Sequence, residues 1–184
     1  MTMSPRLRKF ALTAHVTASV GWLGAVAGFL ALAIAGLTSQ DAQMVRAAYL
    51  AMDLITACVI VPLAFAALLT GIISALGTKW GVFRYYWVVV KLLITMLSII
   101  VLLVHTQPIR LLASVVAKTT VFSADLLGPQ IQMVVASGAT LVVLLVLIGL
   151  SIYKPPGMTP YGWRKQRAQR TGAPAVDAAT ESRS

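Results

Sequence analysis

The third hydrophobic run of the chain, at residues 85–107, holds two side chains that can do chemistry inside a membrane. Lys91 can bind an anion, and His105 can ligate a metal or carry a proton. On a helix nearly every hydrogen-bonding side chain of this run falls on one stripe, which consists of Trp87, Lys91, Thr95, Ser98, Leu102 and His105. Because a lysine that faces lipid is costly, the stripe is expected to face protein, a cofactor or water.

The first two hydrophobic runs carry further candidates. His15, Ser19 and Trp22 follow one another at helical spacing in the first run, and Asp53 lies in the second. The single cysteine, Cys58, excludes a disulfide framework and a cysteine-based metal site.

These residues must be positioned by membrane helices. Of the 184 residues, 59% are hydrophobic and 11% are charged, which is the composition of an integral membrane protein. Four apolar runs, at about 10–37, 47–76, 85–107 and 131–153, are each long enough to cross a hydrocarbon core of about 30 Å. We predict an all-α membrane four-helix bundle at 10–153, after a basic segment at 1–9 and before a basic, partly disordered tail at 154–184.

Smaller signals refine this bundle. Pro62 should kink the second span by removing one backbone hydrogen bond, and Gly24 and Gly28 should let another helix approach closely. The apolar periodicity of residues 109–130 fits an amphipathic helix at the membrane surface between spans three and four.

The basic residues act as an orientation signal. The net charge is +10, and most lysines and arginines fall on the side of the membrane that holds both termini, which predicts cytoplasmic termini. These residues flank hydrophobic spans and do not form one face of a folded domain, so nucleic acid is not an expected partner. The basic tail is expected to contact anionic lipid.

Depth divides the candidates into two groups. Counted from the cytoplasmic ends of their helices, His15 and Lys91 both lie at ~7 Å, whereas His105 lies ~21 Å beyond Lys91. His15 and His105 therefore cannot bind one iron. Asp53 lies in the outer part of the second span, where it is expected to meet His105 as a polar pair.

The first and third runs resemble a known group of membrane proteins. His15 with Trp22-x-Gly24, and later Trp87-x3-Lys91 with a histidine at the end of the same helix, resemble the pattern of HemJ-type and CopD-like proteins. The resemblance covers about a quarter of the chain. It implies a bacterial inner-membrane location and a bound haem b, with electron transfer or tetrapyrrole and haem handling as the role, and copper as the alternative cofactor.

Carried over residue by residue, the resemblance implies a haem pocket near the cytoplasmic face. His15 would be the iron ligand and Lys91 would hold a carboxylate. Trp22 and Trp87 would wall the pocket, Ser19 shares the His15 face, and Met96 is the thioether nearest in depth. Catalytic residues are not assigned, and whether the protein is a membrane oxidoreductase stays open.

Simpler interpretations stand beside these. His15 can bond a backbone carbonyl, Lys91 can extend to the interface, and Asp53 with His105 can be a structural pair. The alternative function is a non-catalytic membrane subunit, or a permease for copper or a small molecule, without haem. A homo-oligomer or a membrane partner subunit is compatible with either function. The chain has no phosphate-binding loop, zinc-protease motif or nucleophile elbow.

Overall fold

The first helices begin at clear capping residues. The computed structural model describes residues 4–77, 85–118, 127–153, 157–160, 162–164 and 167. Helix α1 (Pro5–Thr38) begins after Ser4, whose hydroxyl accepts a hydrogen bond from the Leu7 backbone N–H. Helix α2 (Ala42–Ile55) begins after Asp41, whose Oδ1 accepts from the Gln43 N–H at 2.9 Å.

The second span is one continuous helix with an irregular turn in it. Helix α2 leads into a π-helical turn, η1 (Thr56–Ile60), and then into α3 (Val61–Leu76). The Val61 N–H donates to the Thr56 carbonyl, one residue further back than in an α-helix. Since Pro62 has no N–H to donate, the irregularity predicted for this proline takes the form of a π-turn directly before it.

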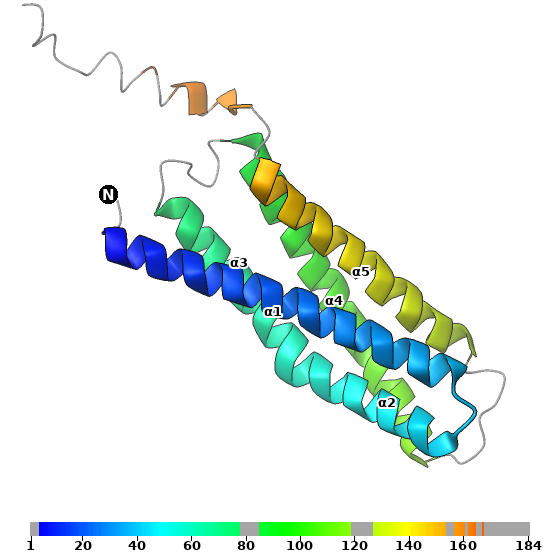
Figure 1. Cartoon of the computed structure of the whole chain (residues 1–184). Coiled ribbons are helices and arrows are strands. Elements are labelled where there is room, and N and C mark those ends of the chain that lie inside the picture. Colours follow the sequence, from blue (N-terminus) through cyan, green and yellow to red (C-terminus); the bar gives the residue numbers. More distant parts are fainter. Residues whose placement is uncertain are drawn as a thin grey trace, which may run out of the picture.

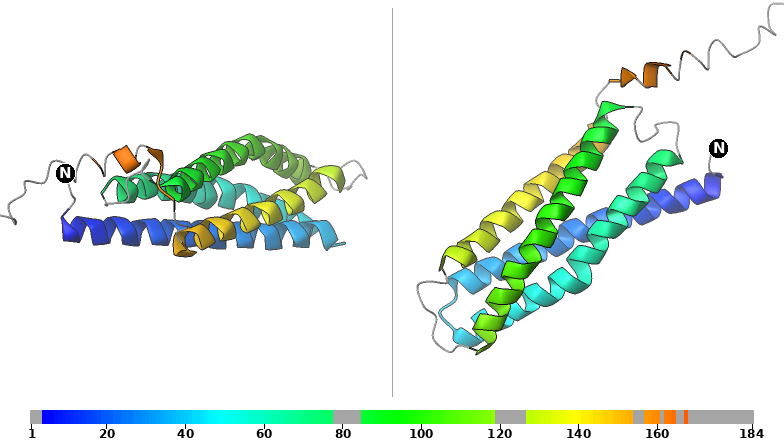
Figure 2. Two further views of the ribbon diagram at one scale, coloured as in Figure 1. Left: turned by 90° about the horizontal axis from the view of Figure 1, so that it is seen from above. Right: turned by 180° about the vertical axis from the view of Figure 1, so that it is seen from behind.

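Helix α4 (Tyr86–Lys118) and helix α5 (Leu127–Tyr153) complete the bundle. Helix α4 continues through Pro108 and arches in the left view of Figure 2. A separate surface helix at 109–130 is therefore not seen. Residues 109–118 are the end of α4, residues 127–130 begin α5, and 119–126 lie outside the described part of the chain.

Consecutive spans run in opposite directions (Figure 1). Helix α1 packs against α2, α3 and α5, and α4 packs against the same three helices, so α1 and α4 lie on opposite sides of the bundle. At the end that holds the N-terminus, the α1/α3 pair diverges from the α4/α5 pair (Figures 1 and 2). His15 and Lys91 belong to these two different pairs.

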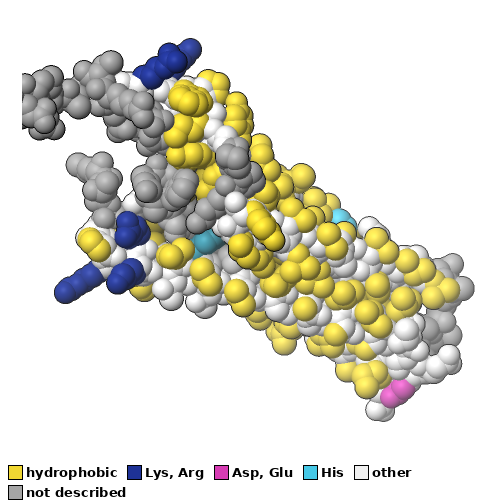
Figure 3. Space-filling model, turned by 45° about the horizontal axis from the view of Figure 1, so that its top comes forward, with side chains coloured by type: hydrophobic (Ala, Val, Ile, Leu, Met, Phe, Trp, Pro, Cys, Tyr) yellow, Lys and Arg dark blue, Asp and Glu magenta, His cyan; other side chains and the backbone are white. Residues whose placement is uncertain are grey.

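Apolar side chains cover the outside of the bundle as well as its core. The core is built around Trp22, Phe29, Tyr49, Met52 and Met133. Figure 3 shows further apolar side chains on the surface, with Lys and Arg gathered near one end and an acidic side chain at the other. Within the described residues, four helical segments are long and apolar enough to cross a membrane, so the all-α prediction is confirmed and these helices fit a membrane protein.

Glycine permits close contact at positions other than the predicted ones. A Cβ atom at Gly24 or Gly28 would meet nothing within 4 Å, so the predicted close approach of another helix of this chain is wrong. A Cβ at Gly36 would lie 2.9 Å from the Tyr49 ring, and one at Gly71 would lie 3.0 Å from the His15 ring. The close contacts at these two glycines are therefore between the backbone of one helix and a side chain of another helix.

The start of the tail returns to the bundle. Met158 forms an isolated antiparallel bridge with Tyr85, and the Tyr86 N–H donates to the Gly157 carbonyl at 3.4 Å. This contact holds the segment after α5 against the first turn of α4. The disorder predicted for the tail after Arg170 falls on residues 171–184, which lie outside the described residues.

Candidate functional site

His15 is held in one orientation by the second span. Its Nδ1 lies 3.0 Å from the Ala67 carbonyl of α3 and 3.3 Å from the Thr70 hydroxyl. A carbonyl only accepts hydrogen bonds, so Nδ1 must carry the proton, and the neutral ring presents a bare Nε2. A backbone carbonyl bonded to one ring nitrogen is the usual way to orient a histidine that ligates a metal through the other.

The face of α3 around His15 is lined by small residues. Ala67, Thr70, Gly71 and Ser74 recur every three or four residues, so they share one side of the helix. Gly71 leaves room for the imidazole, since a Cβ there would press on its Cε1 atom. The Ser74 hydroxyl is enclosed and has no hydrogen-bond partner among the described residues. A donor therefore stays unused one turn along α3 from Gly71, the residue that the His15 ring contacts.

Lys91 lies on the opposite helix, α4, and its ammonium donates to the Ser151 hydroxyl of α5. Ser151 in turn donates to the Leu147 carbonyl at 2.8 Å. A hydroxyl satisfies one donor but does not neutralise the charge. Asp53 is the only acid within the four spans, and it is bound elsewhere, so the described spans offer no counter-charge to Lys91.

His15 and Lys91 are close enough for their charges to interact, although they project from helices on opposite sides of the bundle. That the two residues lie at one depth stays a prediction. A group that accepts the Nε2 lone pair and also carries a negative charge would satisfy both side chains at once.

The other residues predicted for this pocket lie at different places. Trp22 is only 3% exposed and lies in the bundle centre, about 10 Å along α1 from His15. Met96 is 47% exposed on the surface of α4. Ser19 and Trp87 are half-buried. Trp22 is therefore not beside His15, because residues on one face of a helix can lie at different levels along it. Met96 is not beside His15 either, because it lies on the outer surface of α4.

The predicted outer pair is arranged differently as well. Asp53 Oδ1 lies 3.8 Å from Arg110 Nε, and both side chains are largely exposed, at 39% and 68%. They line a cavity of about 170 Å³ between α2 and α4, together with Thr106. His105 instead donates from Nδ1 to the Val101 carbonyl of its own helix at 2.8 Å. Arg110, and not the predicted His105, is therefore the partner of Asp53.

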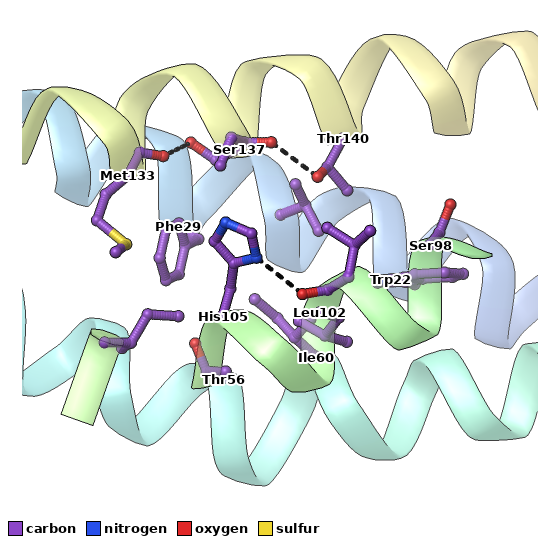
Figure 4. Close-up of a pocket in the computed structure, with 14 residues that line it drawn as sticks. Trp22, Phe29, Thr56, Ile60, Ser98, Leu102, His105, Met133, Ser137 and Thr140 are labelled. Atoms are coloured by element: carbon purple, nitrogen blue, oxygen red, sulfur yellow. Dashed lines mark hydrogen bonds between the residues drawn. The ribbon is translucent and has the colours of Figure 1, made fainter. Parts of the chain in front are cut away.

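A second polar centre lies between the four spans. A cavity of about 60 Å³ is lined by residues of α1, η1, α4 and α5, and Figure 4 shows the His105 ring projecting into it. The polar lining residues are Trp22, Thr56, Ser98, His105, Ser137 and Thr140. Ser98 and His105 belong to the predicted α4 stripe, so the outer half of that stripe faces this cavity.

Cavity size excludes both cavities as tetrapyrrole sites, and donor chemistry favours the residues around His15. Pockets for drug-sized ligands occupy about 300–1,000 Å³, so neither cavity holds a macrocycle. The inner site, defined as His15, Ser74 and Lys91, has the matching chemistry, namely an oriented imidazole, a spare hydroxyl and an uncompensated cation. In the described part of the chain, no three His, Cys, Asp or Glu side chains cluster as they would around a protein-only metal site.

The sequence did not reveal Ala67, Thr70 and Gly71 as neighbours of His15. Their small and polar side chains at helical spacing were a usable signal. The sequence did not indicate which helix these residues would face. Short connections identify helices that are neighbours in sequence order, but they do not specify the register between them.

No known protein family, no curated protein and no solved structure matches this chain.

Proposed function

We propose that the protein binds haem b, or a related tetrapyrrole that carries carboxylates, at the inner site. One observation carries the proposal: Lys91, a cation without an acidic partner in the described spans, lies near an imidazole whose Nε2 is kept free. Haem joins an electrophilic iron to anionic propionates in one apolar molecule. This combination matches both side chains and their membrane setting.

Each residue of the inner site has a stated role. The Nε2 of His15 would bind the iron, and the Ala67 carbonyl would support it by fixing the tautomer. Lys91 would hold a carboxylate, and the unused Ser74 hydroxyl would donate a further hydrogen bond to it. The bound group would supply a one-electron redox centre. Trp22 and Met96 are left out of the site because they lie at the bundle centre and on its surface.

We place the inner site at the cytoplasmic face of a bacterial inner membrane, with a role in electron transfer or in tetrapyrrole handling. The cluster of Arg6, Arg8 and Lys9 at the start of α1 supports this orientation, since basic residues stay on the cytoplasmic side.

Absorption spectroscopy tests the proposal. The protein is expressed in membranes with ample haem supply, purified in mild detergent and measured in oxidised and reduced states. We expect a Soret band that changes on reduction, and saturable binding when haem is added to apoprotein. A colourless protein that neither binds added haem nor separates from a second membrane protein would overturn the proposal in favour of a subunit role.

A further inference from the structure

The cavity between α2 and α4 contains an ion pair that is only loosely formed. Asp53 Oδ1 and Arg110 Nε lie 3.8 Å apart, which is beyond hydrogen-bonding distance. Among the described residues, neither charged side chain has a further partner. The carboxylate can therefore still accept hydrogen bonds and the guanidinium can still donate them, and both residues line a cavity of about 170 Å³.

The π-turn leaves a backbone acceptor at this cavity. In an α-helix the Val61 N–H would donate to the Ala57 carbonyl, but here it donates to the Thr56 carbonyl. Pro62, the next residue, has no N–H to replace it. The Ala57 carbonyl therefore lacks its usual donor within the helix, and Ala57 is one of the residues that line the cavity.

Two threonines that line the cavity have hydroxyl oxygens that can only accept. Thr56 Oγ1 donates its proton to the Met52 carbonyl at 2.7 Å. Thr106 Oγ1 donates its proton to the Leu103 carbonyl at 2.7 Å. The lining residues thus combine one guanidinium with a carboxylate and several neutral acceptors. This set suits a ligand that carries an anionic group and, beside it, a cation with several N–H donors.

The cavity opens to the side of the bundle, near the level of lipid head groups. Ala57 and Leu103, which line it, are exposed on the outside of the described helices. Helix α4 is about 50 Å long, or about 20 Å longer than a hydrocarbon core. Arg110 lies about 12 Å before the end of α4, so in a bundle centred on the membrane it lies near the edge of this core. The loose contact with Arg110 holds Asp53 at the same level.

We propose that this cavity binds the head group of a phospholipid with a primary amine, of the phosphatidylethanolamine class. Arg110 binds the phosphate, and the ammonium donates to Asp53 and to the neutral oxygens. The acyl chains lie against the exposed apolar surface beside Leu103. One water needs about 10–15 Å³ of such space, so the cavity of about 170 Å³ has room for a head group of several heavy atoms.

Other ligands satisfy only part of this set. The quaternary ammonium of phosphatidylcholine has no N–H to donate. An anionic head group would place a phosphate beside Asp53 and leave the carboxylate without a cation that donates to it. A free zwitterion has the charged groups but no acyl chains for the apolar surface. The proposal is separate from the inner site, since none of His15, Ser74 and Lys91 lines this cavity.

Native mass spectrometry of the full-length, delipidated protein tests the proposal. Phosphatidylethanolamine, phosphatidylcholine and phosphatidylglycerol with the same acyl chains are titrated separately. We expect the first bound phosphatidylethanolamine to bind about tenfold more tightly than either other lipid, because a charged hydrogen bond separates them. Excess glycerophosphoethanolamine should not displace the bound lipid. Displacement by this soluble head group would overturn the lipid as the occupant.

Substitutions at the ion pair separate the two halves of the head group. Asp53→Asn removes the charge at similar size and should abolish the preference over phosphatidylglycerol, whereas Arg110→Gln should weaken phosphatidylethanolamine binding about tenfold. Arg46→Gln, which removes an exposed charge of α2 outside the cavity, is the matched control and should change neither.

The comparison of lipids in the unsubstituted protein needs no variant to fold. Equal affinities for the three lipids would overturn the proposal and show that the ion pair only links α2 to α4. A preference for phosphatidylethanolamine that survives in both Asp53→Asn and Arg110→Gln would place the lipid elsewhere on the protein and would overturn it as well.

Discussion

At the scale of single residues, the two histidines differ in what orients them. His15 bonds a carbonyl 52 residues away on another helix, whereas His105 bonds the carbonyl four residues before it on its own helix. The orientation of His15 therefore depends on packing between α1 and α3. Its neighbour Lys91 has a hydroxyl partner but no counter-charge in the described spans, which leaves a cation whose desolvation is uncompensated.

Replacing Lys91 by methionine separates stability from binding. Lys91→Met keeps the length of the side chain and removes the charge, so we expect the apoprotein to become more stable by about 1–3 kcal/mol. Haem affinity should fall by about 10- to 100-fold, because a charged hydrogen bond contributes about 1.5–3 kcal/mol. Thermal unfolding of the apoprotein and haem titration measure the two effects.

Ser151→Ala is the matched control for Lys91→Met. It removes the hydroxyl that Lys91 contacts and keeps the charge, so haem affinity should change little. A less stable Lys91→Met apoprotein with unchanged haem affinity would show that Lys91 serves only to link α4 to α5.

Residue types and counting along the helices predicted that His15 and Lys91 lie at one level, and the structure brings them near each other. The same counting paired Asp53 with His105, and there the structure gives Asp53 to Arg110. Depth along a helix can be counted from the sequence. Rotation about the helix axis and the reach of a flexible arginine depend on packing, which a single sequence does not specify.

At the scale of elements, small residues decide where a helix can receive a side chain. Apolar run lengths predicted four long apolar helices, and proline chemistry predicted a kink at Pro62, where the structure has a π-turn just before the proline. The contact that matters for His15 followed from neither. It arises at Gly71, whereas the more conspicuous Gly24 and Gly28 face open space.

Adding one methyl group to α3 tests this contact. In Gly71→Ala, the new Cβ would lie 3.0 Å from His15 Cε1, so the ring must shift and its bond to the Ala67 carbonyl must weaken. We expect haem affinity to fall about tenfold, or about 1.4 kcal/mol. Haem titration against Gly24→Ala, whose Cβ meets nothing within 4 Å, gives the comparison. Equal affinities for both variants would contradict the role of Gly71.

At the scale of the whole molecule, the basic residues at the start of α1 and the divergence of the helix pairs fall at the same end of the bundle. Helix α1 has 34 residues, which corresponds to about 50 Å, so it extends beyond the hydrocarbon core or tilts within it. The basic residues at the start of α1 lie at the end of the bundle where the helix pairs diverge and where the inner site is found. The inner site therefore lies at the basic end of the bundle, the end that we propose to be cytoplasmic.

Cysteine labelling tests that orientation. In a Cys58→Ala background, Gln40→Cys lies in the connection between α1 and α2, and Ser184→Cys lies at the other end of the membrane axis if both termini are cytoplasmic. A membrane-impermeant maleimide should label Gln40→Cys in intact cells and Ser184→Cys only in permeabilised cells. The reverse pattern would place the inner site on the outer face.

The most direct test of the account compares the two histidines. The chain has only His15 and His105, and both present a bare Nε2, but only His15 lies beside an uncompensated cation. We predict that His15→Ala abolishes the Soret band of the purified protein and that His105→Ala keeps it. A Soret band that survives in His15→Ala and disappears in His105→Ala would contradict the inner haem site.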